Sequence, residues 1–472
     1  MKKIELVFIP VAAAGHLIPL IEFAKRLLER DDRFSITVLV MYSPAMTSLA
    51  AAYAESFAET NTPIRFINLP PPIHFRPSQE VHKSLEKFAT EYVDYHKACV
   101  KEAIVKHLVS NSNSAPLAGL VVDMFCTSMI DVGNELGVPS YLFFPSCAAF
   151  LGLLMHLPTQ YTLTGREFEE FDGEVVIPCY VNPVPSSGLP EFLLNKNGGY
   201  TSLMNHGRRF KETKGIIVNT FEELESHAVN CLLNDFDHVP PVYTVGPLIE
   251  LKGEMQNEIM KWLDDQPESS VVFLCFGSMG CFGEEQLKEI ALGLEQSGHR
   301  FLWSIRKPPT NKLEGPTDYK ADLQEVLPNG FLERTKEIGM VCGWAPQKEI
   351  LGHKSIGGFV SHCGWNSILE SLWFGVPIVT WPMYAEQQIN AFQMVKDIGL
   401  AVELRLDYKI SGGEVVSGDE IARAIKYVMD RDNEVRKKVK EKSEKSRFTV
   451  MEGGSSFAAF GNFIDDVLRN MP

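Results

Sequence analysis

Short apolar runs alternate with amphipathic helical patterns along both halves of this 472-residue chain, and no other feature limits the fold as strongly. Most of these runs are apolar at nearly every position, which is typical of strands that helices cover on both faces. The runs are residues 4–10, 35–42, 64–70, 118–125, 139–145 and 215–221 in the first half, and 270–278, 300–306, 339–346, 357–364 and 376–382 in the second. Helical patterns lie between or after them, for example over residues 284–297, 387–398 and 419–429. Because strands that alternate with helices form parallel sheets, the sequence predicts an α/β fold.

A proline-rich stretch at residues 235–254 separates the two halves, and we interpret it as the passage between two domains. At roughly 150 residues per domain the length would allow about three domains, but two large α/β domains fit as well. The sequence GGSS at 453–456 interrupts the last helical pattern. The predicted boundaries are 1–246 for the first domain and 251–452 for the second, with a final helix within 455–472.

The first 15 residues superficially resemble a secretory signal peptide, because two lysines precede an apolar stretch and small residues. Glu5 and Pro10 interrupt that stretch, and cleavage after Ala14 would cut a strand–loop–helix pattern in its loop. We therefore expect the segment to form the first strand of a folded domain. No run of 18 apolar residues occurs, so we expect no membrane-spanning helix and no stable membrane insertion.

The formal net charge is −15, so the chain has no basic surplus with which to neutralise a polyanion. Nucleic acid and anionic membranes are therefore not expected as partners, although one small anion could still be held locally. The nine cysteines are odd in number and form no CxxC pair, which argues against a disulfide framework or a zinc ribbon and for a reducing compartment. We expect a cytoplasmic protein, and a monomer.

A dense group of polar residues follows the apolar run at 357–364. A helix that starts at about Asn366 would place unpaired N–H groups at the carboxyl end of a parallel strand, where a phosphate is favoured. His362, Asn366 and Ser367 could add donors to the same turn. Ser367 and Glu370 also fit an S-x-x-E capping box, which needs no ligand, so spacing alone leaves capping and ligand binding open.

Two other chemistries at this turn are disfavoured. A Cys363 nucleophile paired with His362 would need adjacent strand side chains to point the same way, whereas they point to opposite faces. A metal site formed by His353, His362 and Cys363 lacks a compact ligand pattern.

Residues 344–387 carry the most specific pattern in the sequence. This 44-residue stretch opens with WAPQ, continues through HCGWNS, ExL, GVP and WP, and closes with EQ. It resembles the signature box of the plant family 1 UDP-dependent glycosyltransferases at nearly every motif position. FGS at 276–278, GH at 15–16 and VVD at 121–123 also match, so the resemblance extends over essentially the whole chain.

The resemblance implies the GT-B architecture, in which two Rossmann-like domains with parallel sheets face each other across a cleft. The first domain would bind the acceptor, the second would bind the UDP-sugar, and the final helix would return to the first domain. The implied UDP-sugar-binding residues are Ser278, Trp344, Ala345, Gln347, His362, Trp365, Asn366, Ser367, Glu370, Glu386 and Gln387.

Each of these residues would contact a particular part of the UDP-sugar. Trp344 would stack on uracil, Ala345 and Gln347 would contact the base and uridine, and Glu370 would hold the ribose hydroxyls. The diphosphate would be bound by Ser278, His362, Asn366 and Ser367, and the sugar hydroxyls by Trp365, Glu386 and Gln387. Trp365 together with Gln387 resembles the glucose-using members of the family.

The candidate site of the first domain lies where Gly15 and His16 open the first predicted helix. The dinucleotide fingerprint G-x-G-x-x-G is absent there, which disfavours a nicotinamide-dependent reductase. An imidazole with an ordinary pKa near 6.5 suits a general base, and Asp123 ends another predicted strand. The resemblance makes His16 and Asp123 a catalytic pair, in which His16 takes a proton from the acceptor and Asp123 orients the imidazolium.

The reaction that the resemblance implies is an inverting transfer of glucose from UDP-glucose to a hydroxyl of a small hydrophobic acceptor, such as a flavonoid, another phenolic or a terpenoid. We expect no cofactor and no metal. Asp235 and Asp237 form a D-x-D, the metal motif of a different glycosyltransferase fold, but they follow no strong strand. A non-catalytic small-molecule-binding protein on the same fold, and another nucleotide-dependent α/β enzyme, are the alternatives.

Aromatic residues at the carboxyl ends of first-domain strands are candidates for lining an acceptor pocket, although core packing is the alternative for most of them. These candidates are Phe125, Phe143, Phe144 and Phe150.

Overall fold

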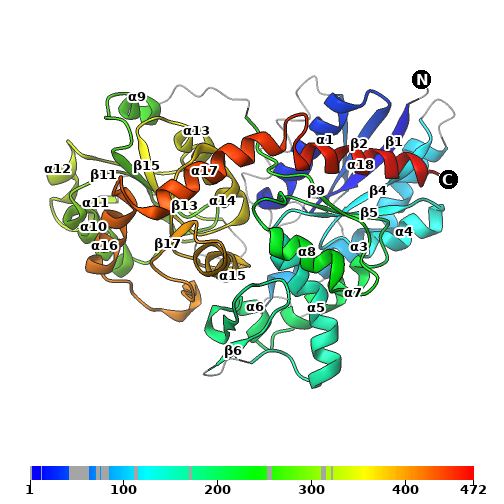
Figure 1. The fold of residues 1–472 in the computed structure, drawn as a ribbon, viewed down its shortest axis with the longest axis horizontal. Helices are drawn as coiled ribbons and strands as arrows, with labels where there is room; N and C mark the ends of the chain where they lie inside the picture. Colours follow the sequence, from blue (N-terminus) through cyan, green and yellow to red (C-terminus); the bar gives the residue numbers. More distant parts are fainter. Residues whose placement is uncertain are drawn as a thin grey trace.

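The computed structural model describes residues 3–11, 13–41, 63–70, 75, 84–110, 115–169, 173–251, 258–309, 315–319 and 323–472. Two parallel sheets, each flanked by helices, lie side by side (Figure 1), which confirms the prediction of an α/β fold with two Rossmann-like domains. Among the described residues, no helix is both long and apolar enough to cross a bilayer.

The first sheet has seven strands in the order β3-β2-β1-β4-β5-β8-β9, and all of its neighbouring pairs are parallel. In chain order the strands are β1 (Ile4–Ile9), β2 (Phe34–Met41), β3 (Ile64–Leu69), β4 (Leu117–Asp123), β5 (Ser140–Phe144), β8 (Ile216–Val218) and β9 (Val242–Thr244). The direction of strand order reverses between β1 and β4. In open α/β sheets a ligand crevice forms at such a reversal, outside the carboxyl ends of the strands.

The second sheet repeats this winding with six parallel strands in the order β14-β11-β10-β15-β16-β17. The strands are β10 (Val271–Cys275), β11 (Arg300–Ser304), β14 (Gly339–Cys342), β15 (Ile356–Ser361), β16 (Ile378–Thr380) and β17 (Ala401–Glu403). Here strand order reverses between β10 and β15, so the second sheet also has one crevice where a ligand is favoured.

The helices of the second half lie close to their predicted positions. The three predicted helices are α10 (Glu284–Ser297), α15 (Gln387–Phe392) and α16 (Gly418–Met429), and α15 continues as a π-helical turn over Gln393–Asp397. This half also contains α14 (Trp365–Phe374) and α17 (Glu434–Thr449). Ser417 and Glu420 form a complete capping box at the start of α16, which fixes where that helix begins.

Helices cover both faces of the first sheet. One face packs against α1 (Ala14–Arg30) and the last helix, α18 (Ser455–Arg469), which crosses back to the first half (Figure 1). The ring centroids of Phe23 on α1 and Phe463 on α18 are 5.4 Å apart. The opposite face packs against α3 (Leu85–Ile104), α4 (Met129–Leu136), α5 (Ala148–Thr164), α7 (Gly199–Phe210) and α8 (Ser226–Asn234).

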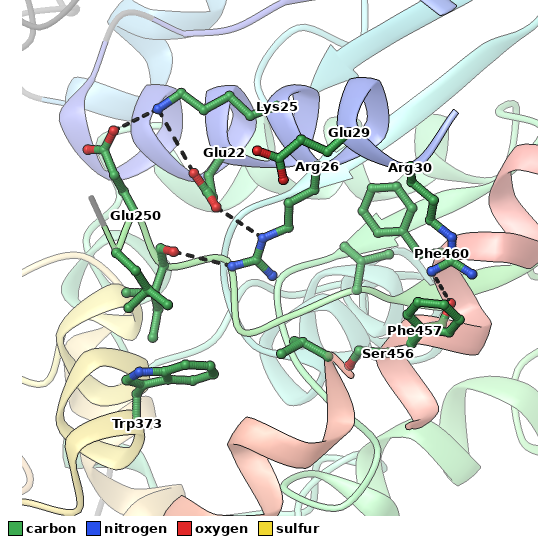
Figure 2. Close-up of a pocket in the computed structure, with 14 residues that line it drawn as sticks. Glu22, Lys25, Arg26, Glu29, Arg30, Glu250, Trp373, Ser456, Phe457 and Phe460 are labelled. Carbon is green, nitrogen blue, oxygen red and sulfur yellow. Dashed lines mark hydrogen bonds and ion pairs between the residues drawn. The ribbon is translucent and has the colours of Figure 1, made fainter. Parts of the chain in front are cut away.

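The passage between the two halves is held against α1. Arg26 donates to the carbonyl oxygens of Pro247 at 3.0 Å and Ile249 at 3.2 Å, while Lys25 pairs with Glu250 at 2.6 Å. These contacts line one side of a cavity of about 500 Å³ between α1, the passage, Trp373 of α14 and the start of α18 (Figure 2). Because α1 also carries the candidate base at its first turn, these contacts connect the passage to the helix that holds the base.

Candidate active site

His16 and Asp123 are in direct contact at the reversal point of the first sheet. His16 lies in the first turn of α1, directly after β1, and Asp123 is the last residue of the neighbouring strand β4. The distance from His16 Nδ1 to Asp123 Oδ2 is 2.8 Å. Asp123 is fully buried, whereas 20% of the His16 side chain is exposed. The sequence indicates this His16–Asp123 pair only through the family resemblance, and the structure places the two side chains in contact.

The surroundings of His16 favour its protonated form. Burial lowers its pKa, but the charge of Asp123, the hydrogen bond to it and the charge of Glu386 outweigh that effect and raise the pKa above 6.5. Asp123 is held in place because its Oδ1 accepts from the backbone N–H of Phe125 at 3.0 Å. A carboxylate only accepts hydrogen bonds, so Nδ1 of His16 carries the proton toward it and Nε2 is left to accept another.

Phe125 lies between His16 and a second histidine, His206, which is buried. Its ring centroid is 5.6 Å from that of His16 and 5.7 Å from that of His206 on α7. His206 bonds through Nε2 to Thr90 and through Nδ1 to Thr127, both at 2.8 Å, and burial lowers its pKa to about 4. Sequence reasoning missed His206, because its helix has an ordinary amphipathic pattern with no motif around the histidine.

The other acceptor-pocket candidates are more deeply buried. Phe144 and Phe150 pack against each other with ring centroids 5.9 Å apart, on the face of the sheet away from α1. Phe143 points to the opposite face, where its ring lies 6.0 Å from that of Phe23 on α1. Successive side chains of a strand alternate between the two faces of the sheet, so Phe143 and Phe144 cannot line the same space. Phe143 is packed in the core under α1, and its assignment to the acceptor pocket is wrong.

The helix α14 begins at the reversal point of the second sheet. Gly364 is its N-cap residue in an extended conformation, and no side chain caps the helix. The capping-box alternative for Ser367 and Glu370 is therefore excluded, since both residues lie inside the helix. Instead, Nε2 of Gln347 donates to Ser367 Oγ and to Glu370 Oε2, each at 2.8 Å. The first N–H groups of α14 consequently have no capping side chain and are oriented to bind an anion.

The imidazole ring of His362 packs between two turns that follow strands of the second sheet. Gly277, which follows β10 with φ +73°, and Gly364 both lie against its ring. A Cβ atom at either glycine would lie 2.6 Å from His362 Nε2, so only glycine allows the two turns to approach this closely. Burial lowers the pKa of His362 to about 4, so it is a neutral donor or acceptor at pH 7. Ser278 follows Gly277 on the first of these turns.

Cys363 has none of the features of a nucleophile. It is fully buried in a left-handed conformation with φ +61°, and burial raises the pKa of its thiol to about 12.

The structure also gives no support to a metal site that includes His353. Nδ1 of His353 is hydrogen-bonded to Ser355 Oγ at 2.8 Å, and its Nε2 to Asp264 Oδ1 at 3.2 Å. The described residues contain no group of three or more His, Cys, Asp or Glu side chains arranged for a metal ion, and all nine cysteines are free thiols.

Of the remaining predicted residues, Trp344 and Ala345 follow β14, and Trp365 is the first residue of α14. Trp344 is 43% exposed at the end of β14, next to the buried Ala345. The indole of Trp365 is buried and donates from Nε1 to the backbone oxygen of Asn219 in the first half, at 2.7 Å. Only the backbone of Trp365 is therefore available to a sugar.

Glu386 and Gln387 lie at the start of α15. Glu386 Oε1 accepts from Ser146 Oγ at 3.2 Å, which links the two halves. Gln387 Oε1 accepts from the backbone N–H groups of Met383 and Tyr384, at 3.0 and 3.1 Å. The side-chain amide nitrogen of Gln387 is the group that these contacts leave for a ligand.

Comparisons with known proteins agree with this arrangement. Residues 219–443 match the family model described as UDP-glucoronosyl and UDP-glucosyl transferase. The chain is 52% identical to UDP-glycosyltransferase 71K1 of Malus domestica over 99% of both chains, and 50% identical to a putative UDP-glucose flavonoid 3-O-glucosyltransferase 3 of Fragaria ananassa over 99% of this chain and 100% of that one. The crystal structure of Medicago truncatula UGT71G1 complexed with UDP-glucose is 46% identical over 98% of both chains, with a TM-score of 0.88. The chain thus belongs to the plant family 1 UDP-dependent glycosyltransferases and is a UDP-glucosyltransferase of GT-B architecture.

Proposed function

We propose that this enzyme transfers glucose from UDP-glucose to a hydroxyl group of a small hydrophobic acceptor, a flavonoid or another phenolic, and forms a β-glucoside by inversion. The contact between His16 and Asp123 carries this proposal, because it places an oriented imidazole at the crevice of the first sheet. The names of two similar proteins of Fragaria ananassa, UDP-glucose flavonoid 3-O-glucosyltransferase 6 and a putative UDP-glucose flavonoid 3-O-glucosyltransferase 3, support the acceptor class. A terpenoid hydroxyl is the second acceptor class to test.

In the proposed reaction, Nε2 of His16 takes the proton of the acceptor hydroxyl while the oxygen attacks the anomeric carbon. The bond between that carbon and the diphosphate oxygen breaks on the opposite face, so the α-linkage of UDP-glucose becomes a β-linkage. Asp123 stabilises the imidazolium that forms, and Phe125 supplies an apolar surface beside it.

The leaving UDP would be held by α14 and the two glycine-containing turns. Its diphosphate charge would be met by the helix N-terminus with Ser278, His362, Asn366 and Ser367, and no metal would be required. General-base catalysis typically gives about 10²–10⁴-fold, or about 2.7–5.5 kcal/mol, which is less than the ~8 kcal/mol or more that enzymes supply. Stabilisation of UDP and alignment of the two substrates must therefore contribute about as much as the base.

The direct test is to incubate the enzyme with UDP-glucose and a panel of phenolics and terpenoids, and to detect glucosides by mass spectrometry. We expect β-glucosides of phenolic acceptors, at a rate that a chelator does not change. Phenolics that bind without forming any product would contradict the proposal, and α-glucosides would contradict inversion. A rate that falls with EDTA and recovers with Mn²⁺ or Mg²⁺ would contradict the metal-free mechanism.

Glu370 gives the donor site a pH dependence. Burial raises its pKa to about 7, although the hydrogen bond from Gln347 opposes this. Its carboxylate would accept hydrogen bonds from the ribose hydroxyls, and the neutral acid, which grows in population as the pH falls below 7, accepts them less well. We expect UDP affinity, measured by calorimetry, to fall between pH 8 and pH 6.

Glu370→Gln should weaken UDP binding at pH 8 by about tenfold or more and remove this pH dependence, because hydrogen bonds to a charged group are worth about 1.5–3 kcal/mol. Glu403→Gln on the edge strand β17 is the matched control and should bind UDP like the wild type. A pH dependence that persists in Glu370→Gln would contradict the assignment of Glu370 to the ribose.

A further inference from the structure

Asn219 lies where the two halves of the enzyme meet, and all of its hydrogen-bonding groups except one amide hydrogen have a partner. It follows β8 and is fully buried. Its backbone N–H donates to Phe144 O at 3.0 Å, and its backbone oxygen accepts from Trp365 Nε1 at 2.7 Å. Its side chain accepts from the Leu248 N–H through Oδ1 at 2.9 Å and donates from Nδ2 to Asn366 Oδ1 at 3.3 Å. One residue thus contacts the first sheet, the interdomain passage and the first turn of α14.

The chain of hydrogen bonds continues to the turn that carries the candidate base. Nδ2 of Asn366 donates to the backbone oxygen of Gly15 at 3.0 Å, and Gly15 directly precedes His16. Four groups are therefore connected in series: the passage at Leu248, Asn219, the first turn of α14, and the first turn of α1.

The orientation of the first amide determines that of the second. Because Oδ1 of Asn219 is occupied by the Leu248 N–H, its Nδ2 must face Asn366. A donor in that position requires Oδ1 of Asn366 as acceptor, which turns Nδ2 of Asn366 toward Gly15. An acceptor in place of Asn219 Nδ2 would reverse this order and break the link to Gly15.

We propose that Asn219 is a positioning residue for glucosyl transfer, which fixes the turn of His16 relative to the N-terminus of α14. The inference rests on the proposed role of His16 as the base. Asn219 lies outside the 344–387 box and contacts the site through Asn366 and Trp365. Since a displacement of about 1 Å at a reacting centre can cost about 10²-fold in rate, a residue that sets this spacing affects turnover without touching either substrate.

Asn219→Asp tests the proposal with almost no change in shape. One carboxylate oxygen still accepts from Leu248, but the other faces Asn366 Oδ1 and repels it, so the Asn366 amide turns over and loses Gly15. We expect kcat to fall by about tenfold, with a smaller change in the KM for UDP-glucose. The turned Asn366 amide and the added carboxylate also weaken diphosphate binding, but the backbone N–H groups of α14 and the uridine contacts remain in place.

Asn433→Asp is the matched control. Asn433 is also buried and donates from Nδ2 to Tyr427 O at 2.7 Å and Asp430 O at 2.9 Å, at the N-cap of α17 in the second domain. This variant loses the same donor away from the domain interface, so it should lower Tm while kcat stays near the wild-type value. If Asn219→Asp behaves in the same way, or changes only the KM for UDP-glucose, the proposal is overturned.

Amide hydrogen exchange gives a readout that does not depend on turnover. Peptides that cover residues 13–20 and 364–370 should exchange faster in Asn219→Asp than in the wild type, and at the wild-type rate in Asn433→Asp. Unchanged exchange in both peptides overturns the proposal even if kcat falls. If His16→Ala instead keeps its turnover, the base assignment fails, while the exchange result still decides whether Asn219 holds the turn.

Discussion

Replacing His16 with alanine is expected to lower kcat by about 10²–10⁴-fold while UDP affinity stays near the wild-type value. The substitution removes the imidazole at the crevice of the first sheet but leaves α14 and the turns around His362 unchanged. Single-turnover glucoside formation, followed by mass spectrometry at saturating UDP-glucose, measures the chemical step directly.

His227→Ala is a suitable control, because it removes an exposed histidine of the first domain that bonds to the Pro178 carbonyl. It should keep wild-type turnover. A His16→Ala enzyme with retained turnover would disprove the base assignment, and one that had also lost UDP affinity would show a structural defect instead.

Asp123→Asn is expected to lower kcat by a similarly large factor, because it changes which nitrogen of the His16 imidazole carries the proton. Oδ1 of the new asparagine can keep the hydrogen bond from the Phe125 N–H, which turns its NH₂ group toward His16 Nδ1. A donor there requires Nδ1 to be the acceptor, so the proton of the neutral imidazole moves to Nε2, the atom that should receive the acceptor's proton. We expect kcat to fall by about 10²–10⁴-fold, the usual contribution of a general base; the same replacement in a catalytic triad costs about 10⁴-fold.

The pH profile separates this mechanism from a general loss of structure. The charge of Asp123 raises the pKa of His16, so the acid limb of kcat/KM in the wild type should have its midpoint above 6.5. In Asp123→Asn the residual activity should show this midpoint at a lower pH, since the opposing charge is gone and burial lowers the pKa. Asp31→Asn, at the other end of α1, should leave the profile unchanged; an unshifted midpoint in Asp123→Asn would refute the pairing.

Much of the fold was predictable because local patterns and tertiary packing agree. The helix over Glu284–Ser297 has the predicted bounds, and the glycine-containing turn before α14 lies at a sheet reversal as the motif implies. These features depend on short-range periodicity and on the geometry of parallel sheets, which the sequence expresses directly. The residue boundaries of the two domains stay a prediction.

The errors arose where the sequence pattern is the same for two structures. Strand β5 is apolar on both faces, so nothing in its sequence distinguishes Phe143, which faces α1, from Phe144, which faces α5. Ser367 and Glu370 have capping-box spacing, which left that alternative open; the structure excludes it because the helix begins earlier, with Gly364 as its N-cap residue. Asn219 is an ordinary residue at the end of an apolar run, and its importance depends on partners 29 and 147 positions away.

Because α18 crosses back to the first sheet, the first domain needs the last part of the chain to be complete. Phe460, Phe463, Ile464 and Val467 of this helix complete the apolar layer over α1 and the first sheet. During translation that layer stays uncovered until residues 455–469 have left the ribosome, by which time the whole second domain has emerged. The domain that starts the chain can therefore be completed only after the second domain has been synthesised.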